Sequence, residues 1–153
     1  MARMHSTRFR GLEFVIPLLA IGKAEGAGKT KTGRPYIYNL KTTDRFMKAV
    51  KAHVQAELAT HPAAADYPSD LPIAMELAFF LPRPKNVGAK EKWPSMCKPD
   101  NSNVRKAIED AMTGVVYVDD KQIVDGSDKK RFCAEGDEPS IRILLWRAGQ
   151  RNG

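Results

Sequence analysis

Residues 98–114 are KPDNSNVRKAIEDAMTG, and the acidic pair Asp119-Asp120 follows shortly afterwards. Side chains that can cap a helix come after the proline, and apolar residues then recur at helical spacing until Gly114 ends the segment. These apolar residues are Val104, Ala107, Ile108, Ala111 and Met112. At about 100° per residue, Asn103, Lys106 and Asp110 fall on one polar stripe. The stretch therefore predicts an amphipathic helix, and the apolar run 115–118 predicts a short strand that ends at two acids.

The acids of this region are candidates for a metal site. Asp100 at the helix start and Asp119-Asp120 after the next strand could converge on one point. Clustered carboxylates repel each other and are usually held by a divalent cation, and Mg²⁺ suits an all-oxygen site. In phosphodiester cleavage, Lys106 would then offset charge on the transition state or on the leaving oxygen.

Spacing alone favours a structural explanation of the same residues. Asp100 would only cap the helix, and Asp119-Asp120 would form an acidic turn. Lys106 would pair with Asp110 one helical turn away. On this explanation the region is a well-capped surface helix without chemistry.

The remaining pattern predicts a single α+β domain over residues 1–153, with a small mixed or antiparallel sheet packed against two main helices. We expect strands over residues 12–19, 35–40, 71–81 and 140–146, and a helix that Thr43 caps and that runs to about Thr60. Residues 121–133 and the last strand are expected to form a closing antiparallel pair. Residues 1–8 and 148–153 are expected to be flexible tails.

The composition favours a polyanionic partner. The chain has 153 residues and a net charge of +7, with a sequence pI near 9.5. Its basic residues concentrate in two segments that either track a phosphate backbone or are merely solvated connections. The candidate DNA contacts are Lys29, Lys31 and Arg34 in the first segment, Arg83, Lys85, Lys90, Lys92 and Lys98 in the second, and Lys121.

Several other classes of protein are disfavoured. The sequence GAGKT at residues 26–30 lacks a P-loop's first glycine, because Lys23 stands five positions before Gly28. No apolar run reaches membrane-spanning length, and Met1 to Gly11 lacks the core of a signal peptide, so we expect a soluble, intracellular protein. Cys97 and Cys133 have no zinc-binding spacing and are assigned no chemistry.

The motif residues resemble the signature of the RusA family of Holliday-junction resolvases, which runs roughly K-P-D-x-D-N-x-x-K, D-A-L-x-G and D-D-x-Q-V. The matching positions are Lys98-Pro99-Asp100, Asn103, Lys106, Asp110-Ala111, Gly114 and residues 119–124. The resemblance implies a homodimeric, Mg²⁺-dependent endonuclease that nicks two strands of a four-way DNA junction symmetrically in recombination and repair, with Mn²⁺ as a substitute ion. It also implies a bacterial or phage-encoded protein of the cytoplasm.

Carried over by position, the resemblance implies Asp100 and Asp120 as catalytic metal ligands, with Asp119 adjacent, and Lys106 as a catalytic lysine. Ser102 stands where the family pattern usually has a second Asp, which removes a charged ligand. The metal site would then be looser, would recruit Asp110 or Asp119 instead, or would be inactive, and Ser102 and Asn103 are further candidates for the metal shell. Glu109 is a poorer substitute, since it lies about 10 Å along the helix from Ser102.

Two functions follow from this pattern. The first is a junction endonuclease, and the second is a catalytically weak junction-binding protein of the same fold. A basic RNA-binding module is a more distant alternative.

Overall fold

The structure is a computed structural model that describes residues 11–94 and 97–150, apart from the side chain of Tyr38. In this described part, four strands form one sheet in the order β1-β6-β4-β5, and two strands form a separate hairpin. The strands are β1 (Gly11–Ile16), β2 (Glu25–Lys29), β3 (Pro35–Asn39), β4 (Ile73–Leu81), β5 (Ile123–Phe132) and β6 (Ser140–Arg147). The helices are α1 (Lys41–Ala59), α2 (Asn101–Met112) and the short 3₁₀ helices η1 (Ala64–Asp66) and η2 (Asp120–Gln122). This mixed sheet with two main helices confirms the predicted α+β class.

The sheet is mixed because α2 lies between β4 and β5 in the chain. A helical crossover returns the chain in the same direction, and β5 accordingly pairs parallel with β4. β6 then enters between β1 and β4 and pairs antiparallel with both. The predicted closing pair of residues 121–133 with the last strand is therefore wrong, since a parallel pairing across a helix is not visible in local sequence.

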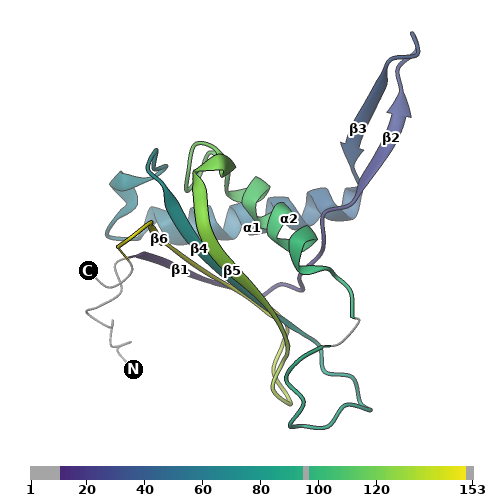
Figure 1. The fold of residues 1–153 in the computed structure, drawn as a ribbon, viewed down its shortest axis with the longest axis vertical. Coiled ribbons are helices and arrows are strands. Elements are labelled where there is room, and N and C mark those ends of the chain that lie inside the picture. Colours follow the sequence, from purple (N-terminus) through teal and green to yellow (C-terminus); the bar gives the residue numbers. More distant parts are fainter. Residues whose placement is uncertain (1–10, 95–96, 151–153) are drawn as a thin grey trace.

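One hydrophobic core joins the two helices to one face of the sheet. The predicted inward positions of β4 are buried, namely Ile73, Met75, Leu77 and Phe79. The helical positions are buried as well: Phe46, Val50, Val54 and Leu58 on α1, and Val104, Ala107, Ile108, Ala111 and Met112 on α2. α1 and α2 pack against each other (Figure 1). The core therefore fixes the orientation of α2, whose other face is polar.

Two local expectations are corrected. α1 begins at Lys41 after Leu40, and Thr43 is a buried residue whose hydroxyl accepts a hydrogen bond from the Ala24 amide at 3.1 Å. Thr43 therefore anchors the segment before the hairpin instead of capping the helix. Residues 115–118 are not a strand, because Gly114 takes a positive φ of 83° and the chain turns back so that the Gly114 amide donates to the Tyr117 carbonyl. A four-residue apolar run does not distinguish a strand from such a buried turn.

Two segments project from the body (Figure 1). One is the β2–β3 hairpin, and the other is the loop between β4 and α2, of which residues 82–94 and 97–99 are described. α2 lies between them. Because β2 covers the GAGK part of the GAGKT sequence and a second strand follows it, the segment lacks the helix that a P-loop requires.

The predicted tails are only partly described. Residues 1–8 and 151–153 lie outside the described residues. The Ala148 amide donates to the Pro72 carbonyl at 2.9 Å, so the chain remains attached to the body just beyond β6. Among residues 11–94 and 97–150, no helix has the length and apolar character needed to cross a membrane.

Candidate active site

Asp100 immediately precedes α2 and occupies its N-cap position. Its carbonyl oxygen accepts the first helical hydrogen bond, from the Val104 amide at 3.1 Å. Within the described residues its carboxylate makes no capping hydrogen bond, although Asp is a favoured N-cap residue. The side chain is exposed, so this acid is available to a ligand.

Lys130 holds the segment that leads to Asp100. It lies on β5, and its ammonium donates to the Cys97 carbonyl at 2.6 Å and to the Pro99 carbonyl at 3.2 Å. Hydrogen bonds from a charged donor are stronger than those between neutral groups. The half-buried Lys130 therefore ties the start of α2 to the sheet. Sequence reasoning missed this residue, because a lysine in a strand gives no local signal of a contact some thirty residues away in the chain.

Lys106 faces Asp120 across the gap between α2 and η2. Its ammonium lies 3.9 Å from Asp120 Oδ2, and both side chains reach solvent, at 55% and 31% exposure. Asp120 also acts on Glu109. Burial is the main reason that the pKa of Glu109 is raised, the neighbouring Arg105 opposes this rise, and the negative charge of Asp120 adds to it. Asp120 thus lies beside the middle of α2 in a group of mixed charges.

Asp119 serves a structural purpose that the sequence left undecided. Its carboxylate accepts from the Lys121 amide at 2.9 Å and caps η2, while Gln122 Oε1 accepts from the amides of Val118 and Asp119 at 2.8 and 2.9 Å. The Lys121 amide and a hydrogen bond with Asp120 lower the pKa of Asp119. This reciprocal capping box gives a physical reason for an Asp and a Gln three positions apart.

Gln122 also joins this turn to the body. Its side-chain amide donates to the carbonyls of Ser69 and Leu71 at 2.8 and 3.0 Å. The turn that presents Asp120 is consequently fixed from both sides. Sequence reasoning assigned no role to Gln122 apart from its place in the motif.

Asp110 is bound by Lys23, and the predicted pairing of Lys106 with Asp110 is not the one formed. The Lys23 ammonium lies 2.9 Å from Asp110 Oδ2 and 2.9 Å from Glu25 Oε1, and these two bonds raise the pKa of Lys23. The Lys23 amide also donates to the Asn103 carbonyl at 3.0 Å. Asp110 therefore attaches the base of the hairpin to α2.

The acids do not form a ready-made metal cage. Among the described residues, no group of three or more His, Cys, Asp or Glu side chains is placed to hold a metal ion. Asp100 stands at the start of α2, and Asp120 lies beside the Lys106 ammonium and adds to the negative charge felt by Glu109. Ser102 and Asn103 lie exposed between them. These residues fit a Mg²⁺ ion that is held by one or two carboxylates, with water and substrate phosphate as its other ligands. Proteins commonly bind Mg²⁺ in this way.

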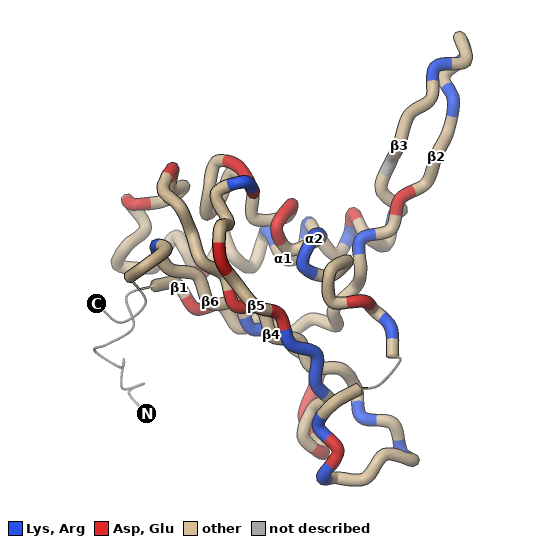
Figure 2. Tube along the Cα trace, viewed as in Figure 1, with Lys and Arg blue, Asp and Glu red and all other residues tan. Residues whose placement is uncertain are grey.

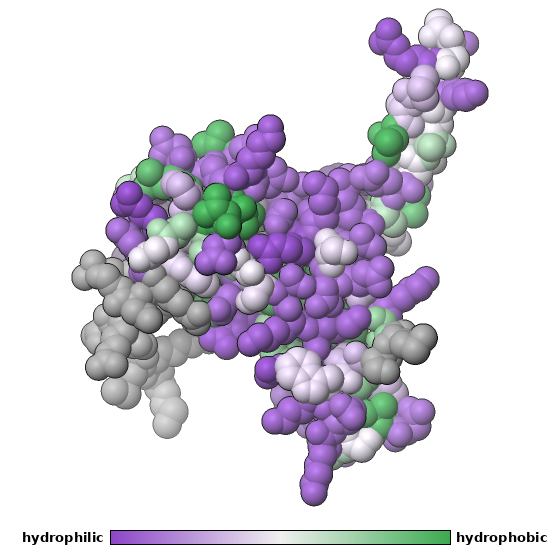
Figure 3. Space-filling model, viewed as in Figure 1, coloured by the Kyte–Doolittle hydropathy of each residue, from purple (hydrophilic) through white to green (hydrophobic). Residues whose placement is uncertain are grey.

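The candidate DNA contacts other than Lys121 lie on the two projections, which carry several basic residues (Figure 2). The exposed ones are Lys29, Lys31 and Arg34 on the hairpin, Lys85, Lys90, Lys92 and Lys98 on the loop before α2, and Lys121 at η2. The surface between the projections is largely hydrophilic (Figure 3). The basic charge thus lies on either side of the polar face of α2.

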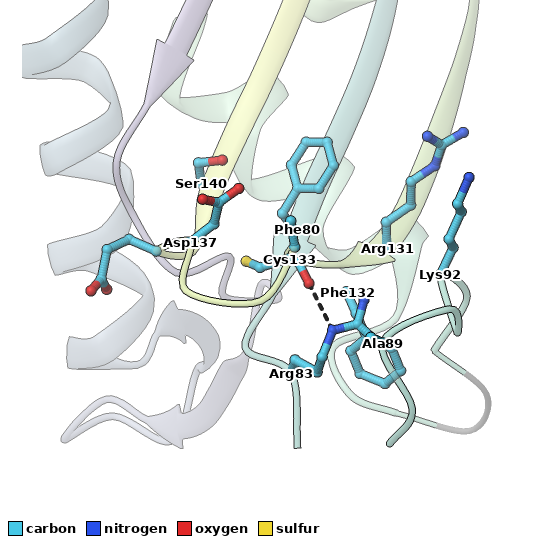
Figure 4. A pocket seen from close by; sticks show the side chains of 11 residues that line it. Phe80, Arg83, Ala89, Lys92, Arg131, Phe132, Cys133, Asp137 and Ser140 are labelled. Atoms are coloured by element: carbon cyan, nitrogen blue, oxygen red, sulfur yellow. Dashed lines mark hydrogen bonds between the residues drawn. The ribbon is translucent and has the colours of Figure 1, made fainter. Parts of the chain in front are cut away.

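Arg83 is engaged in holding the loop together. Its guanidinium donates to the carbonyls of Cys133, Gly88 and Glu91 at 3.0, 2.6 and 2.7 Å and lies over the Phe132 ring (Figure 4). Three backbone carbonyls satisfy much of its donor capacity. The structure shows that Arg83 holds the loop together by hydrogen bonds. A contact between Arg83 and a DNA phosphate stays a prediction.

The chain is similar in sequence to known proteins. The sequence model of the family described as endodeoxyribonuclease RusA matches residues 23–145. The chain is also similar to a Bacillus subtilis (strain 168) protein named uncharacterized protein YqaN, with 28% identity over 83 residues. That similarity covers 48% of this chain and 56% of the Bacillus protein, so it spans about half of each.

Proposed function

This chain belongs to the RusA endodeoxyribonuclease family, and on that basis we propose that it is a structure-specific endodeoxyribonuclease. Its substrate is a four-way DNA junction, which it resolves by paired symmetric nicks in recombination and repair. Two symmetric nicks require two equivalent sites, so the acting species is a homodimer. The main structural support for the proposal is the contact between Lys106 and Asp120 on the polar side of α2.

Charge supports DNA as the partner. The two basic projections flank α2 (Figures 1 and 2), and a branched duplex presents closely spaced phosphates in several directions. Lysines on the hairpin and on the loop before α2 would contact different arms of such a junction. The chain's net charge of +7 would also speed the encounter with a polyanion.

Asp120, Asp100 and Lys106 are the residues we propose for the chemistry. Asp120 and Asp100 would hold Mg²⁺, or Mn²⁺ in its place, together with phosphate oxygens of the DNA. When bound, the ion supplies Lewis-acid polarisation of the phosphodiester. Lys106 places a positive charge next to Asp120 and would offset the negative charge that develops on the phosphate or the leaving oxygen. Three further polar residues would lie next to this metal site and stabilise it: Asp119, Asn103 and Asp110.

A second candidate is a junction-binding protein with weak catalysis. Ser102 stands where the family pattern usually has an acid, and no group of three acids is placed for a metal within the described residues. A neutral hydroxyl is a poor ligand for Mg²⁺ compared with a carboxylate. These observations favour a protein that cleaves slowly but keeps the basic surface for binding a junction.

The test compares a synthetic four-way junction with a linear duplex of the same sequence, each incubated with the purified protein with and without Mg²⁺. The endonuclease proposal expects paired nicks in opposite strands of the junction, only with Mg²⁺, and an intact duplex. Tight junction binding without nicks at any Mg²⁺ or Mn²⁺ concentration would favour the binding protein. Equal cleavage of both substrates would refute junction specificity.

A further inference from the structure

Trp93 is an exposed aromatic side chain on the loop before α2, and 54% of its surface is accessible. Tryptophan side chains are highly buried on average in folded proteins. Trp146, in contrast, is buried in β6 at 8% exposure. The exposure of Trp93 calls for an explanation because nothing in the core requires an indole at this place.

Arg131 supports one face of the Trp93 ring. Its guanidinium carbon lies 4.6 Å from the ring centroid, at the distance of a cation–π contact. Arg131 Nε is buried and, among the described residues, finds no hydrogen-bond partner. This guanidinium therefore lies on the ring while its Nε has no partner within the described residues. The ring has a charged support on one side and solvent access elsewhere.

The loop that carries Trp93 is attached to the end of β5 and is also held together by bonds within the loop itself. The Phe132 amide donates to the Lys92 carbonyl at 3.0 Å, and the Trp93 amide donates to Glu91 Oε1 at 3.1 Å. Arg83 holds two further carbonyls of the same loop. Trp93 is therefore presented by a fixed support, which lowers the entropy that a ligand must overcome.

The same strand anchors both Trp93 and Asp100. Phe132 on β5 holds Lys92, next to Trp93, while Lys130 on β5 holds Pro99, next to Asp100. Two residues of a strand span about 7 Å. The exposed indole is thereby linked to the start of the candidate active site through one short piece of β5.

The loop that carries the ring is rich in cations. Residues 83–98 contain five Lys or Arg and one acid, Glu91. Lys92 and Arg131 line one pocket, and Figure 4 shows Asp137 on the other side of that pocket. An accessible aromatic face among basic side chains is the pattern by which proteins bind unpaired nucleobases, with the ring stacking on the base and the cations contacting phosphate. Contact between two copies of this chain through this loop would bring like charges together.

We propose that Trp93, supported by Arg131, is a stacking site for an unpaired nucleobase of DNA beside the strand to be cut. A fully paired duplex keeps its bases stacked on each other and cannot offer one, whereas a branch point has bases that can leave the stack. Trp93 would therefore favour branched or single-stranded DNA over duplex. This inference rests on the proposed function for its substrate, but it concerns binding and is measured without cleavage.

The test follows tryptophan emission of the full chain during titration with a four-way junction or a matched duplex, in EDTA so that no nick can form. Subtracting the signal of Trp93→Phe isolates Trp93. Fluorescence anisotropy of labelled DNA reports binding independently for wild type, Trp93→Ala, Trp93→Phe and the control Val15→Ala, which removes an exposed apolar side chain at the opposite edge of the sheet.

Stacking predicts quenching of Trp93 that saturates together with binding to the junction and is weak with the duplex. It predicts that Trp93→Ala lowers junction affinity by about 5- to 100-fold, the range for loss of one base stacked on an aromatic ring. Trp93→Phe should retain most of the affinity, and duplex affinity should change less than about twofold.

Binding of the junction with unchanged Trp93 emission and unchanged affinity of Trp93→Ala would overturn the stacking site while leaving the nuclease proposal intact. A shift of Trp93 emission with protein concentration alone would also overturn it, in favour of a protein–protein contact. Quenching without any nick in the Mg²⁺ assay would keep the stacking site and refute only the endonuclease. Absence of all DNA binding would overturn both.

Discussion

The ammonium of Lys106 lies 3.9 Å from Asp120 Oδ2, whereas the Asp110 carboxylate one turn further along α2 is bound by Lys23 at 2.9 Å. The structure thus separates two acids that look equivalent in the sequence. Asp110 fastens the hairpin base to the helix, and Asp120 stays at the surface with one cation beside it. An exposed ion pair of this kind contributes less than about 1 kcal/mol to stability. Replacing either residue should therefore leave the fold nearly as stable, so the proposed role of the pair can be tested by mutation.

Ser102 lies on the exposed side of α2, one turn before Lys106, so an acid at this position would add a charged ligand between Asp100 and Asp120. We expect Ser102→Asp to lower the Mg²⁺ concentration needed for half-maximal nicking by about tenfold, the size of effect seen when groups around a metal are changed. The neutral, similarly sized Ser102→Asn is the control. An unchanged Mg²⁺ dependence in both variants would place Ser102 outside the metal shell.

The side chain of Gln122 makes four hydrogen bonds, two within the acidic turn and two that join this turn to Ser69 and Leu71. Replacing it with Leu leaves backbone groups without partners, so Gln122→Leu should lower the free energy of unfolding by about 2 kcal/mol or more. For a chain of this size we expect a fall in Tm of about 4–8 °C. Gln55→Leu, on the exposed side of α1, should change stability by less than about 0.5 kcal/mol. Equal Tm values for the two variants would contradict this role of Gln122.

Lys130 binds two carbonyls in the segment that leads to Asp100. Lys130→Met keeps the apolar stem and removes both bonds, which should cost about 1.5–3 kcal/mol of stability. Denaturant unfolding measures this loss. Lys129→Met, the exposed neighbour on β5, should have little effect. If the two variants unfold alike, the Lys130 bonds do not hold the start of α2.

The exposed lysines of the loop before α2 should determine the salt dependence of DNA binding. Removing one lysine that neutralises a phosphate should reduce the slope of log K against log [salt] by about 0.9. We therefore expect a flatter slope for Lys85→Ala and Lys92→Ala, and no change for Lys51→Ala, an exposed residue of α1 outside both basic projections. Anisotropy titrations between low and moderate salt give the slopes. Identical slopes for all three variants would leave the loop as a connector.

Much of the fold was predictable because its signals are local. The positions Ile73, Met75, Leu77 and Phe79 alternate as a half-buried strand does, and both main helices carry an apolar stripe. The errors concern pairing and turns. The parallel alignment of β5 with β4 depends on the path of α2, and the turn at residues 114–118 depends on packing that no short window of sequence contains.

The sequence named candidate site residues, and the structure shows which of them are occupied by structural contacts, while their catalytic roles stay predictions. The motif identified Asp100, Lys106 and Asp120. The motif did not show which acids are available to a ligand. In the structure Asp119 caps a turn and Asp110 binds Lys23. The anchors Gln122 and Lys130 act over long sequence separations, and Arg83 was grouped with DNA contacts because a binding arginine and a structural one look alike in sequence.

The role of Asp120 and Lys106 in cleavage is tested most directly by the single-turnover rate at which Asp120→Asn and Lys106→Gln nick a four-way junction. The matched control is Asp125→Asn, which changes an exposed acid of β5. If Asp120 and Lys106 act on the phosphate, both variants should lose at least about 10²-fold in rate, as when one stabilising group is removed from a transition state. Their junction affinity and Tm should stay near wild type, and Asp125→Asn should cleave normally. If Asp120→Asn nicks the junction at the wild-type rate, Asp120 does not act in cleavage.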